Sequence, residues 1–217
     1  MKRWATALAG CAVIAGLAMP ASAADTGARV AAPAGFGAEQ HALAFLRSRK
    51  IDVSYDSLTR ALQNADIQVI AALLDGGVPV GAAAAPRANA AVTSGLAVVC
   101  QKTPVPADRV GQALTLLVDH GLPIGYAHEM GNTILLSAAQ FCPAPVAAWI
   151  IALGAPVDPV NRQRFTPLKM ALVSGKWDVA TVLVDHGARV TRQDLAQLFI
   201  EPPQDPDVRA LLERATQ

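Results

Sequence analysis

The residues that come closest to a known catalytic pattern are His128 and Glu129, in the sequence His128-Glu129-Met130-Gly131-Asn132. A zinc peptidase of this type needs a second histidine one helical turn after the first, so that both can bind the metal. Asn132 stands in that place, and Gly131 favours a turn over a helix. The sequence therefore predicts an exposed turn here, and no metal site.

The other candidate constellations are weaker still. His120 and His186 occupy the same register of two repeated segments, so stacking of those segments would hold them roughly 20 Å apart, too far to share a metal ion. The run Ser174-Gly175-Lys176 lacks the first glycine and the spacing of a phosphate-binding loop, and no G-x-S-x-G motif is present. We expect no enzymatic activity and no cofactor.

Composition limits the other classes of function. The chain has 217 residues, of which 53% are apolar and 16% charged, which fits one globular unit or repeat array and is too apolar for a disordered protein. Eighteen basic residues against seventeen acidic ones give a net charge of +1, which is too small to attract the phosphates of a nucleic acid. We therefore expect no nucleic-acid partner.

The first residues have the pattern of an export signal. Lys2 and Arg3 precede an uncharged, largely apolar run, and residues 21–23 supply the small residues of a cleavage site. We expect a signal peptide at 1–23, a flexible linker at 24–37, and a periplasmic protein, with secretion as the alternative. Cys11 ends a sequence similar to a lipoprotein cleavage site, but the apolar run before it is too short for that reading. No later segment is expected to span a membrane.

Removal of the signal would leave two cysteines, Cys100 and Cys142. An even number of cysteines in an oxidising compartment suggests a disulfide. Two buried, inert thiols are the alternative.

The strongest pattern in the chain is an internal repeat. Four segments end alike, with glycines at positions 77, 121, 154 and 187, so that the last two intervals are equal and the first is longer. A second motif, Thr133-Ile134-Leu135-Leu136-Ser137-Ala138, recurs after the same shorter interval as Thr166-Pro167-Leu168-Lys169-Met170-Ala171. A repeat of this length predicts a stacked array of similar units.

These motifs resemble the ankyrin repeat family, whose 33-residue unit carries a T-P-L-H-x-A motif. The best copy runs from Phe165 to Val190. The resemblance implies an all-α solenoid of helix-turn-helix units with short hairpin loops. It places a repeat domain at 38–217, with a cap at 38–53, repeats at about 54–86, 87–130, 131–163 and 164–190, and a divergent C-terminal repeat at 191–214.

Elementary chemistry supports the same helices. A threonine at the start of each unit caps a helix with its hydroxyl, and Pro167 occupies a first-turn position where no hydrogen bond is lost. In the second helix of the best copy, Val179 and Leu183 belong to one apolar stripe, and Gly187 ends that helix. Each pair needs a neighbour to bury its stripe.

Two departures from the repeat are informative. The second unit has eleven extra residues. We expect them mainly in a loop at 101–108, with part in a hairpin at 82–89. Lys50 stands where the cap should have glycine.

Equivalent positions on stacked helices lie roughly 8 to 10 Å apart, so a Cys100–Cys142 bond requires the insertion to bend one end inward.

In the family, partners are held by the hairpin tips and the exposed faces of the first helices. Of the two expected tips, one contains the acidic residue Glu129 and the other, at 161–164, is basic. Trp149 and Trp177 are expected to pack within the protein. The resemblance implies partner-binding roles for Tyr126, His128, Glu129, Asn132, Asn161, Arg162, Gln163, Arg164 and Lys169.

Together these observations predict a monomeric, non-enzymatic module that binds a protein partner on its concave surface in the bacterial envelope. Its rigid surface would recognise the partner at little ordering cost. Alternatives are an immunity-type inhibitor of a toxin or enzyme, and a structural or stress-protection protein without one specific partner. A small-ligand site or an unfamiliar active site at the insertion is a further alternative.

Overall fold

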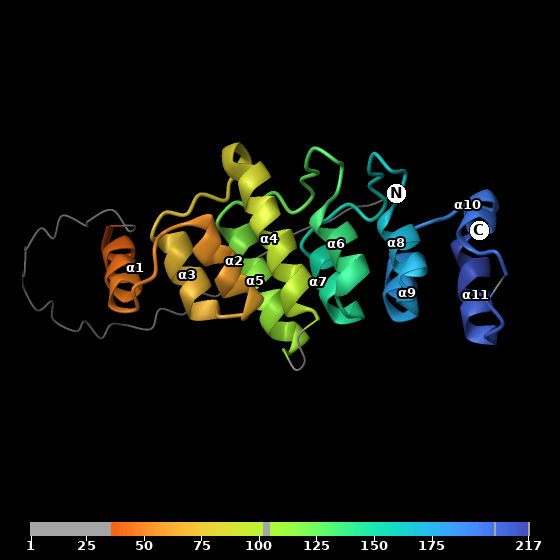
Figure 1. Ribbon diagram of the computed structural model, residues 1–217, viewed down its shortest axis with the longest axis horizontal. Coiled ribbons are helices and arrows are strands. Elements are labelled where there is room, and N and C mark those ends of the chain that lie inside the picture. Colours follow the sequence, from red (N-terminus) through yellow and green to blue (C-terminus); the bar gives the residue numbers. More distant parts are fainter. Residues whose placement is uncertain (1–35, 102–104, 202, 217) are drawn as a thin grey trace, which may run out of the picture. The chain divides into compact units, whose positions relative to one another are not determined.

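Helices and the turns between them make up the described part of the chain (Figure 1), which comprises residues 36–101, 105–201 and 203–216 of a computed structural model. No strand occurs among these residues. The predicted signal peptide at 1–23 lies outside them, as does the predicted linker up to residue 35 and part of the predicted loop at 101–108. The all-α class predicted from the sequence is confirmed.

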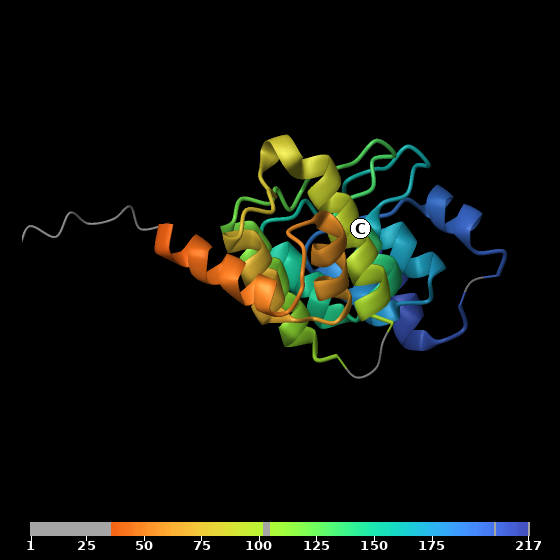
Figure 2. The same ribbon diagram turned by 60° about the vertical axis from the view of Figure 1, so that its left-hand side comes forward.

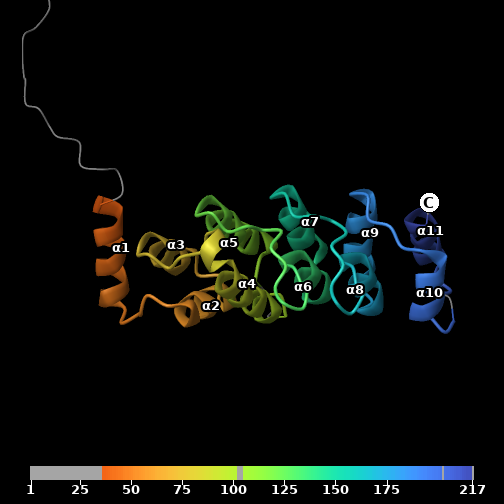
Figure 3. The ribbon, with the colours of Figure 1, turned by 90° about the horizontal axis from the view of Figure 1, so that it is seen from above.

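The helices form two rows, seen side by side in Figure 3. Within a row, each helix packs against the next one, and α2, α6 and α8 also pack against the helices that follow them in the chain. One row contains α2 (Tyr55–Gln63), α4 (Ala85–Val99), α6 (Ile134–Phe141), α8 (Pro167–Val173) and α10 (Arg192–Leu198). The other contains α1 (Phe36–Ser48), α3 (Ile67–Asp75), α5 (Ala107–Asp119), α7 (Ala144–Ala152), α9 (Trp177–Asp185) and α11 (Pro206–Ala215).

Hydroxyl groups cap four of the five helices in the first row, whereas α4 begins after Ala84 without a side-chain cap. Thr133 Oγ1 accepts a hydrogen bond of 3.2 Å from the Leu136 backbone N–H, and Thr166 Oγ1 accepts one of 3.2 Å from the Lys169 N–H. Ser54 does the same for α2. Each cap satisfies one of the N–H groups that a helix start leaves without a partner.

The second row ends in a recurring turn. Gly77, Gly121, Gly154 and Gly187 all have a positive φ, between 92° and 101°. The turn returns the next backbone N–H to the helix, as in the 2.9 Å bond from Ala188 to the Leu183 carbonyl. Lys50 makes the same turn after α1 with a φ of 57°, and the Ile51 N–H bonds to Leu46 at 2.9 Å. The repeat therefore continues into the cap without its glycine.

The core lies between the two rows and continues from one unit to the next. Leu58, Leu114, Ile150 and Leu183 are fully buried in it. Small residues bring neighbouring helices close: a Cβ atom on Gly95 would lie 2.6 Å from Leu62 Cβ. The apolar stripe of each helix is thus covered by its neighbours, as expected for stacked units.

The insertion in the second unit lies mainly after α4, because Cys100 precedes Gly121 by 21 residues whereas its counterpart Cys142 precedes Gly154 by 12. Helix α4 has 15 residues, against 9, 8 and 7 in α2, α6 and α8, and α5 has 13 against 9 in α3, α7 and α9. The segment 82–89 is helical throughout, as a short 3-10 helix (Ala82–Ala84) followed by the start of α4. Alanine has the highest helix propensity, and this segment is rich in it. Nine of the eleven extra residues therefore follow Cys100, between α4 and the end of α5, where the sequence placed most of them. At 82–89 a helix replaces the expected hairpin.

A disulfide joins the ends of α4 and α6. Cys100 and Cys142 are the C-cap residues of these neighbouring helices, and their Cα atoms lie 4.7 Å apart. Equivalent positions on stacked helices are expected at the wider spacing of whole helix axes, so these two helix ends converge. The disulfide interpretation, rather than that of two free thiols, is the one the structure supports.

No helix in the described residues is both long enough and apolar enough to cross a membrane.

We predict that Lys50→Gly stabilises the protein. A left-handed conformation costs a non-glycine residue about 1 to 2 kcal/mol, partly offset by the entropy that glycine loses on folding. The free energy of unfolding in urea should rise by about 0.5 to 1 kcal/mol. Ser48→Gly, two residues earlier within α1, is the control and should lower it by about 1 kcal/mol. A destabilised Lys50→Gly variant would contradict the assignment of this turn.

We also predict that replacing both cysteines by alanine lowers the free energy of unfolding by about 2 to 4 kcal/mol, because the unfolded chain loses a cross-link. Urea unfolding of the oxidised protein and the double variant measures this difference. Reduced wild-type protein is the control and should behave like the variant. Intact mass after alkylation of unfolded, unreduced protein that lacks residues 1–23, and with them Cys11, should show no modified thiol; two modified thiols would refute the bond.

Candidate functional site

Two hairpin tips project at one edge of the stack, next to the first turns of α4 (Figures 1 and 2). The connection from α5 to α6 contains the first tip, residues 125–132, and that from α7 to α8 contains the second tip, residues 158–165. These tips carry most of the residues for which a partner-binding role is predicted.

Both tips use the same backbone turn. The His128 N–H bonds to the Asn132 carbonyl at 3.2 Å, and the Asn161 N–H bonds to the Phe165 carbonyl at 3.0 Å. Positive φ values of 78° at Gly131 and 65° at Arg164 occur one repeat length apart, at the matching place in each turn. The repeat therefore extends to the tips, even though their side chains differ.

Asn161 holds the second tip together and attaches it to the first. Its Oδ1 accepts hydrogen bonds from the backbone N–H groups of Gln163, at 3.0 Å, and Phe165, at 2.8 Å. Its Nδ2 donates to Asn132 Oδ1 at 2.8 Å. The residue is only 4% exposed. Asn161 thus acts as an internal brace, and its predicted role as a contact residue is not favoured by this burial.

The backbones of the two tips also touch. The Arg162 N–H donates to the Met130 carbonyl at 3.0 Å. A Cβ atom on Gly131 would lie 2.9 Å from the Asn161 Cα atom, closer than such atoms come in proteins. Glycine at 131 therefore allows both the turn and the close approach.

The first tip is braced from its other side by α4. Asn89 is fully buried, and its Nδ2 donates to the Tyr126 carbonyl at 3.2 Å. Its Oδ1 has no partner among the described residues. This contact was not predicted from the sequence. The available signal was a single asparagine among alanines, since a polar side chain in buried surroundings is rarely without a hydrogen bond.

An ion pair lies at the base of the second tip. Lys169 Nζ is 2.5 Å from Asp194 Oδ1 and also donates to the Arg164 carbonyl at 3.3 Å. The hydrogen bond from Lys169, followed by one from the Thr191 hydroxyl, lowers the pKa of the Asp194 carboxyl. Asp194 and Thr191 also form a capping box at the start of α10. The Lys169 ammonium group is thus paired within the protein, which leaves less of its charge to interact with a partner.

A second carboxyl near this edge, that of Asp158, has a raised pKa. Burial raises the pKa of Asp158, although a hydrogen bond from the Arg189 backbone N–H and the charge of Arg189 act against it. The N–H to Oδ2 distance is 3.2 Å. Asp158 therefore ties the base of the second tip to the turn that follows α9.

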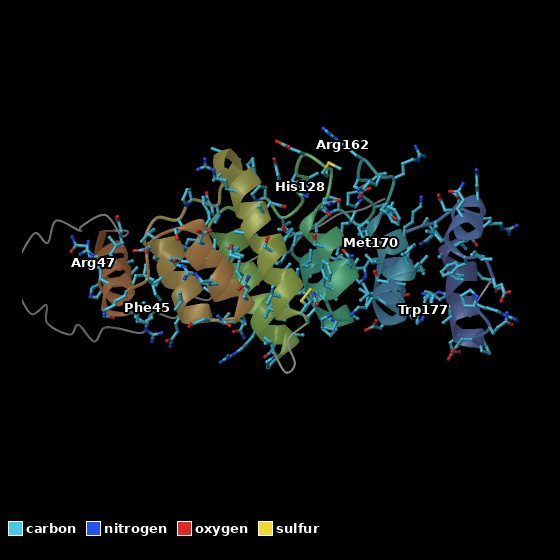
Figure 4. All side chains as sticks on the ribbon, in the orientation of Figure 1. Phe45, Arg47, His128, Arg162, Met170 and Trp177 are labelled. Carbon is cyan, nitrogen blue, oxygen red and sulfur yellow. A yellow bond between two sulfur atoms is a disulfide. The ribbon has the colours of Figure 1, made fainter. Side chains whose placement is uncertain are left out.

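The predicted partner-binding residues divide into three groups by exposure. Glu129, Arg162, Gln163 and Arg164 are exposed, and Figure 4 shows Arg162 at the outer edge, near His128. Tyr126, His128, Asn132 and Lys169 are half-buried, and Asn161 is buried. The structure brings all of them to the two tips and the start of α8. We call the four exposed residues the tip surface.

The two tryptophans pack within the protein. Trp149 donates a 3.1 Å hydrogen bond from Nε1 to Thr115 Oγ1 and covers Gly111, where a Cβ would lie 2.3 Å from the indole. Trp177 stacks on Phe199, with ring centroids 6.2 Å apart. These contacts agree with the packing roles expected for both residues.

The histidines contact nearby groups of the protein. His120 Nε2 lies 3.1 Å from Asp75 Oδ1, and His128 Nδ1 accepts a hydrogen bond from the Met130 N–H at 3.0 Å. Across the described ranges, no group of three or more histidine, cysteine or acidic side chains is placed to hold a metal ion.

Paired helices and left-handed turns recur through the described chain. Four of the five first-row helices have a hydroxyl cap, and the two hairpin tips lie one repeat length apart. The fold is an ankyrin-repeat fold. The chain is similar to the ankyrin repeat domain of human ASB11, with 22% sequence identity and a TM-score of 0.43, over 84% of this chain and 97% of that one. No family model and no curated protein matches the sequence.

We predict that Asn161→Ala loosens the tips. The change leaves Asn132 Oδ1 and two backbone N–H groups without their partner, so the free energy of unfolding should fall by about 2 to 3 kcal/mol. Urea unfolding measures the loss, and faster amide exchange at Gln163 and Phe165 would locate it. Arg162→Ala, at an exposed neighbour whose backbone N–H bond is kept, is the control and should change stability by less than about 0.5 kcal/mol. Equal effects of the two changes would refute the role of Asn161.

Asp194→Asn should remove part of the acid sensitivity of the protein. Because the folded state lowers the pKa of Asp194, its stabilising effect is present above the ordinary value of 3.8 and is lost as the pH falls through the folded pKa. Wild type should exceed the variant by about 1 kcal/mol at neutral pH, and the difference should vanish in acid. Urea unfolding across this pH range tests it, with Asp52→Asn, an exposed carboxylate, as control. A constant difference down to the lowest pH would contradict the prediction.

Proposed function

We propose that this protein is a non-enzymatic module that binds a protein partner through its tip surface. The supporting observation is the brace at Asn161, which holds two neighbouring tips in one arrangement while Glu129, Arg162, Gln163 and Arg164 remain exposed. A surface that is ordered before binding loses little conformational entropy when a partner docks. Exposed charged groups on such a surface suit selective recognition of another protein.

Export to the bacterial envelope is part of the proposal. Its support is the pattern of residues 1–23 and the disulfide between Cys100 and Cys142, since disulfides persist in oxidising compartments such as the periplasm. The partner would then be a protein of the envelope or one that enters it.

The residues predicted for binding would play different parts. The tip surface would contact the partner, Tyr126 and His128 would border it, and Asn132, Asn161 and Lys169 would hold the tips in position. We therefore leave Lys169 out of the test variant, because its loss would also break the ion pair with Asp194.

The test is capture of a partner by the tagged mature protein from an envelope extract of the source bacterium, followed by size-exclusion chromatography of the complex. The variant Arg162→Glu with Arg164→Glu should lose the stoichiometric complex, because like charges across an interface repel. Arg47→Glu is the matched control. Arg47 is an exposed arginine on α1, at one end of the stack and away from the tips (Figure 4), and its variant should keep the complex.

Two results would contradict the proposal. One is the absence of any stoichiometric partner for either protein. The other is a complex that the Arg162 and Arg164 variant retains at full affinity, because the tip surface would then not be the binding site. Circular dichroism of each variant should match wild type, which shows that any loss of binding is not a loss of folding.

A further inference from the structure

The second tip covers one flank of the first tip and donates hydrogen bonds to it. The Arg162 N–H donates to the Met130 carbonyl at 3.0 Å, and the Asn161 amide donates to Asn132 at 2.8 Å. The backbone of the first tip thus acts as a hydrogen-bond acceptor for the polypeptide that packs against it.

The equivalent flank of the second tip receives no such neighbour in the described chain. Helix α9 ends at Asp185 and α10 begins at Arg192, so residues 186–191 form a short connection without a tip. Gln163 lies one repeat length after Met130, and within the described ranges no group donates to its carbonyl. Val160, on the same tip, is 61% exposed. The second tip is therefore uncovered on the flank that faces away from the first tip.

A groove of about 620 Å³ lies beside this flank. Its cationic side chains are Arg164, Lys169, Arg189 and Arg192, and its one carboxylate, Asp194, is already paired with Lys169. The groove therefore has a clear excess of positive charge, in a protein whose net charge is only +1.

The groove also has apolar surface, mainly from the exposed Val160, since Val190 is buried. Arginine and valine side chains together suit a chain that alternates acidic and apolar residues, because successive side chains of an extended segment point in opposite directions. Such a segment can also donate its backbone N–H groups, which a phosphate or a nucleic-acid backbone cannot do.

We propose that this flank, the vacant tip seat, binds an extended acidic segment of the partner protein. The seat consists of Val160, Gln163, Arg164, Arg189 and Arg192. A backbone N–H of the segment would donate to the Gln163 carbonyl as Arg162 does to Met130. Its carboxylates would face Arg164 and Arg192, because the Arg189 guanidinium already donates to the Val184 and Ala188 carbonyls. The inference rests on the proposed function and names the chemistry of the partner at one end of its surface.

The experiment uses the mature protein and a fluorescent synthetic peptide in which aspartate and valine alternate. Fluorescence anisotropy should show saturable binding that weakens as salt is added. The variant Arg164→Glu with Arg192→Glu should reduce affinity by about tenfold or more, while Arg47→Glu should not change it. Amide shifts in NMR spectra should be concentrated at Val160, Gln163 and Arg189.

Two further peptides separate the interactions. A lysine-for-aspartate peptide should not bind. A peptide with the aspartates kept but its backbone nitrogens methylated cannot donate to Gln163, and it should bind more weakly than the parent. Equal binding of the methylated peptide would overturn the backbone pairing, and equal binding of the lysine peptide would overturn the charge recognition.

Other occupants of the seat are also outcomes of this test. Displacement of the peptide by an equal concentration of inorganic phosphate or of an oligonucleotide would overturn the assignment to a polypeptide. Self-association of the protein in sedimentation experiments, lost in the Arg164 and Arg192 variant, would assign the seat to a second copy. If a captured partner instead binds the seat variant normally and needs Arg162 and Glu129, the proposed function stands and this inference is wrong.

Discussion

Each helix pair in this protein carries an apolar stripe that its own partner helix cannot fully cover, so the units are stable only when stacked. This requirement sets the distances between helices and, through them, the residues at the contacts. Gly95 lets α4 approach Leu62, and Gly111 makes room for the indole of Trp149. A larger residue at either place would push one unit away from the next. The hairpin tips are then carried at a spacing that the cores beneath them determine.

Hydrogen bonds at the tips join neighbouring units as well, in addition to the apolar packing beneath them. Asn161 connects the second tip to Asn132 of the first, and Asn89 reaches from α4 to the Tyr126 carbonyl. Two asparagines therefore connect three successive units along the edge where the charged side chains are exposed. Because buried hydrogen bonds of this kind are directional, they hold the tips more narrowly than apolar packing alone would.

The repeat period made most of the fold predictable. Glycines recurring with the same register, followed by threonine motifs, gave the helix ends and the helix starts, and Thr133, Thr166 and Gly187 have the capping and turn roles expected of them. The insertion was correctly placed after the first helix of the second unit, but the helix at 82–89 was not predicted. A loss of repeat signal indicates where a pattern changes but not whether the segment is loop or helix, and there the alanine content was the better guide.

Side-chain contacts between units were harder to predict. Asn161 was predicted to contact a partner because it lies in a tip, and nothing in a single sequence reveals that it bonds to the neighbouring tip instead. The closeness of Cys100 and Cys142 was likewise underestimated, because the average distance between stacked helices does not describe how two particular helix ends converge.

The disulfide also changes how the stack can come apart. In an array in which each unit touches only its neighbours, opening can start at an end and proceed unit by unit. Cys100 and Cys142, at a sequence separation of 42, close a covalent ring across the boundary between the second and third units. Opening that begins at α1 or at α11 reaches this ring before it can cross the molecule. The bond thus acts as a barrier in the middle of a linear assembly, and the first tip, at 125–132, lies inside the protected segment.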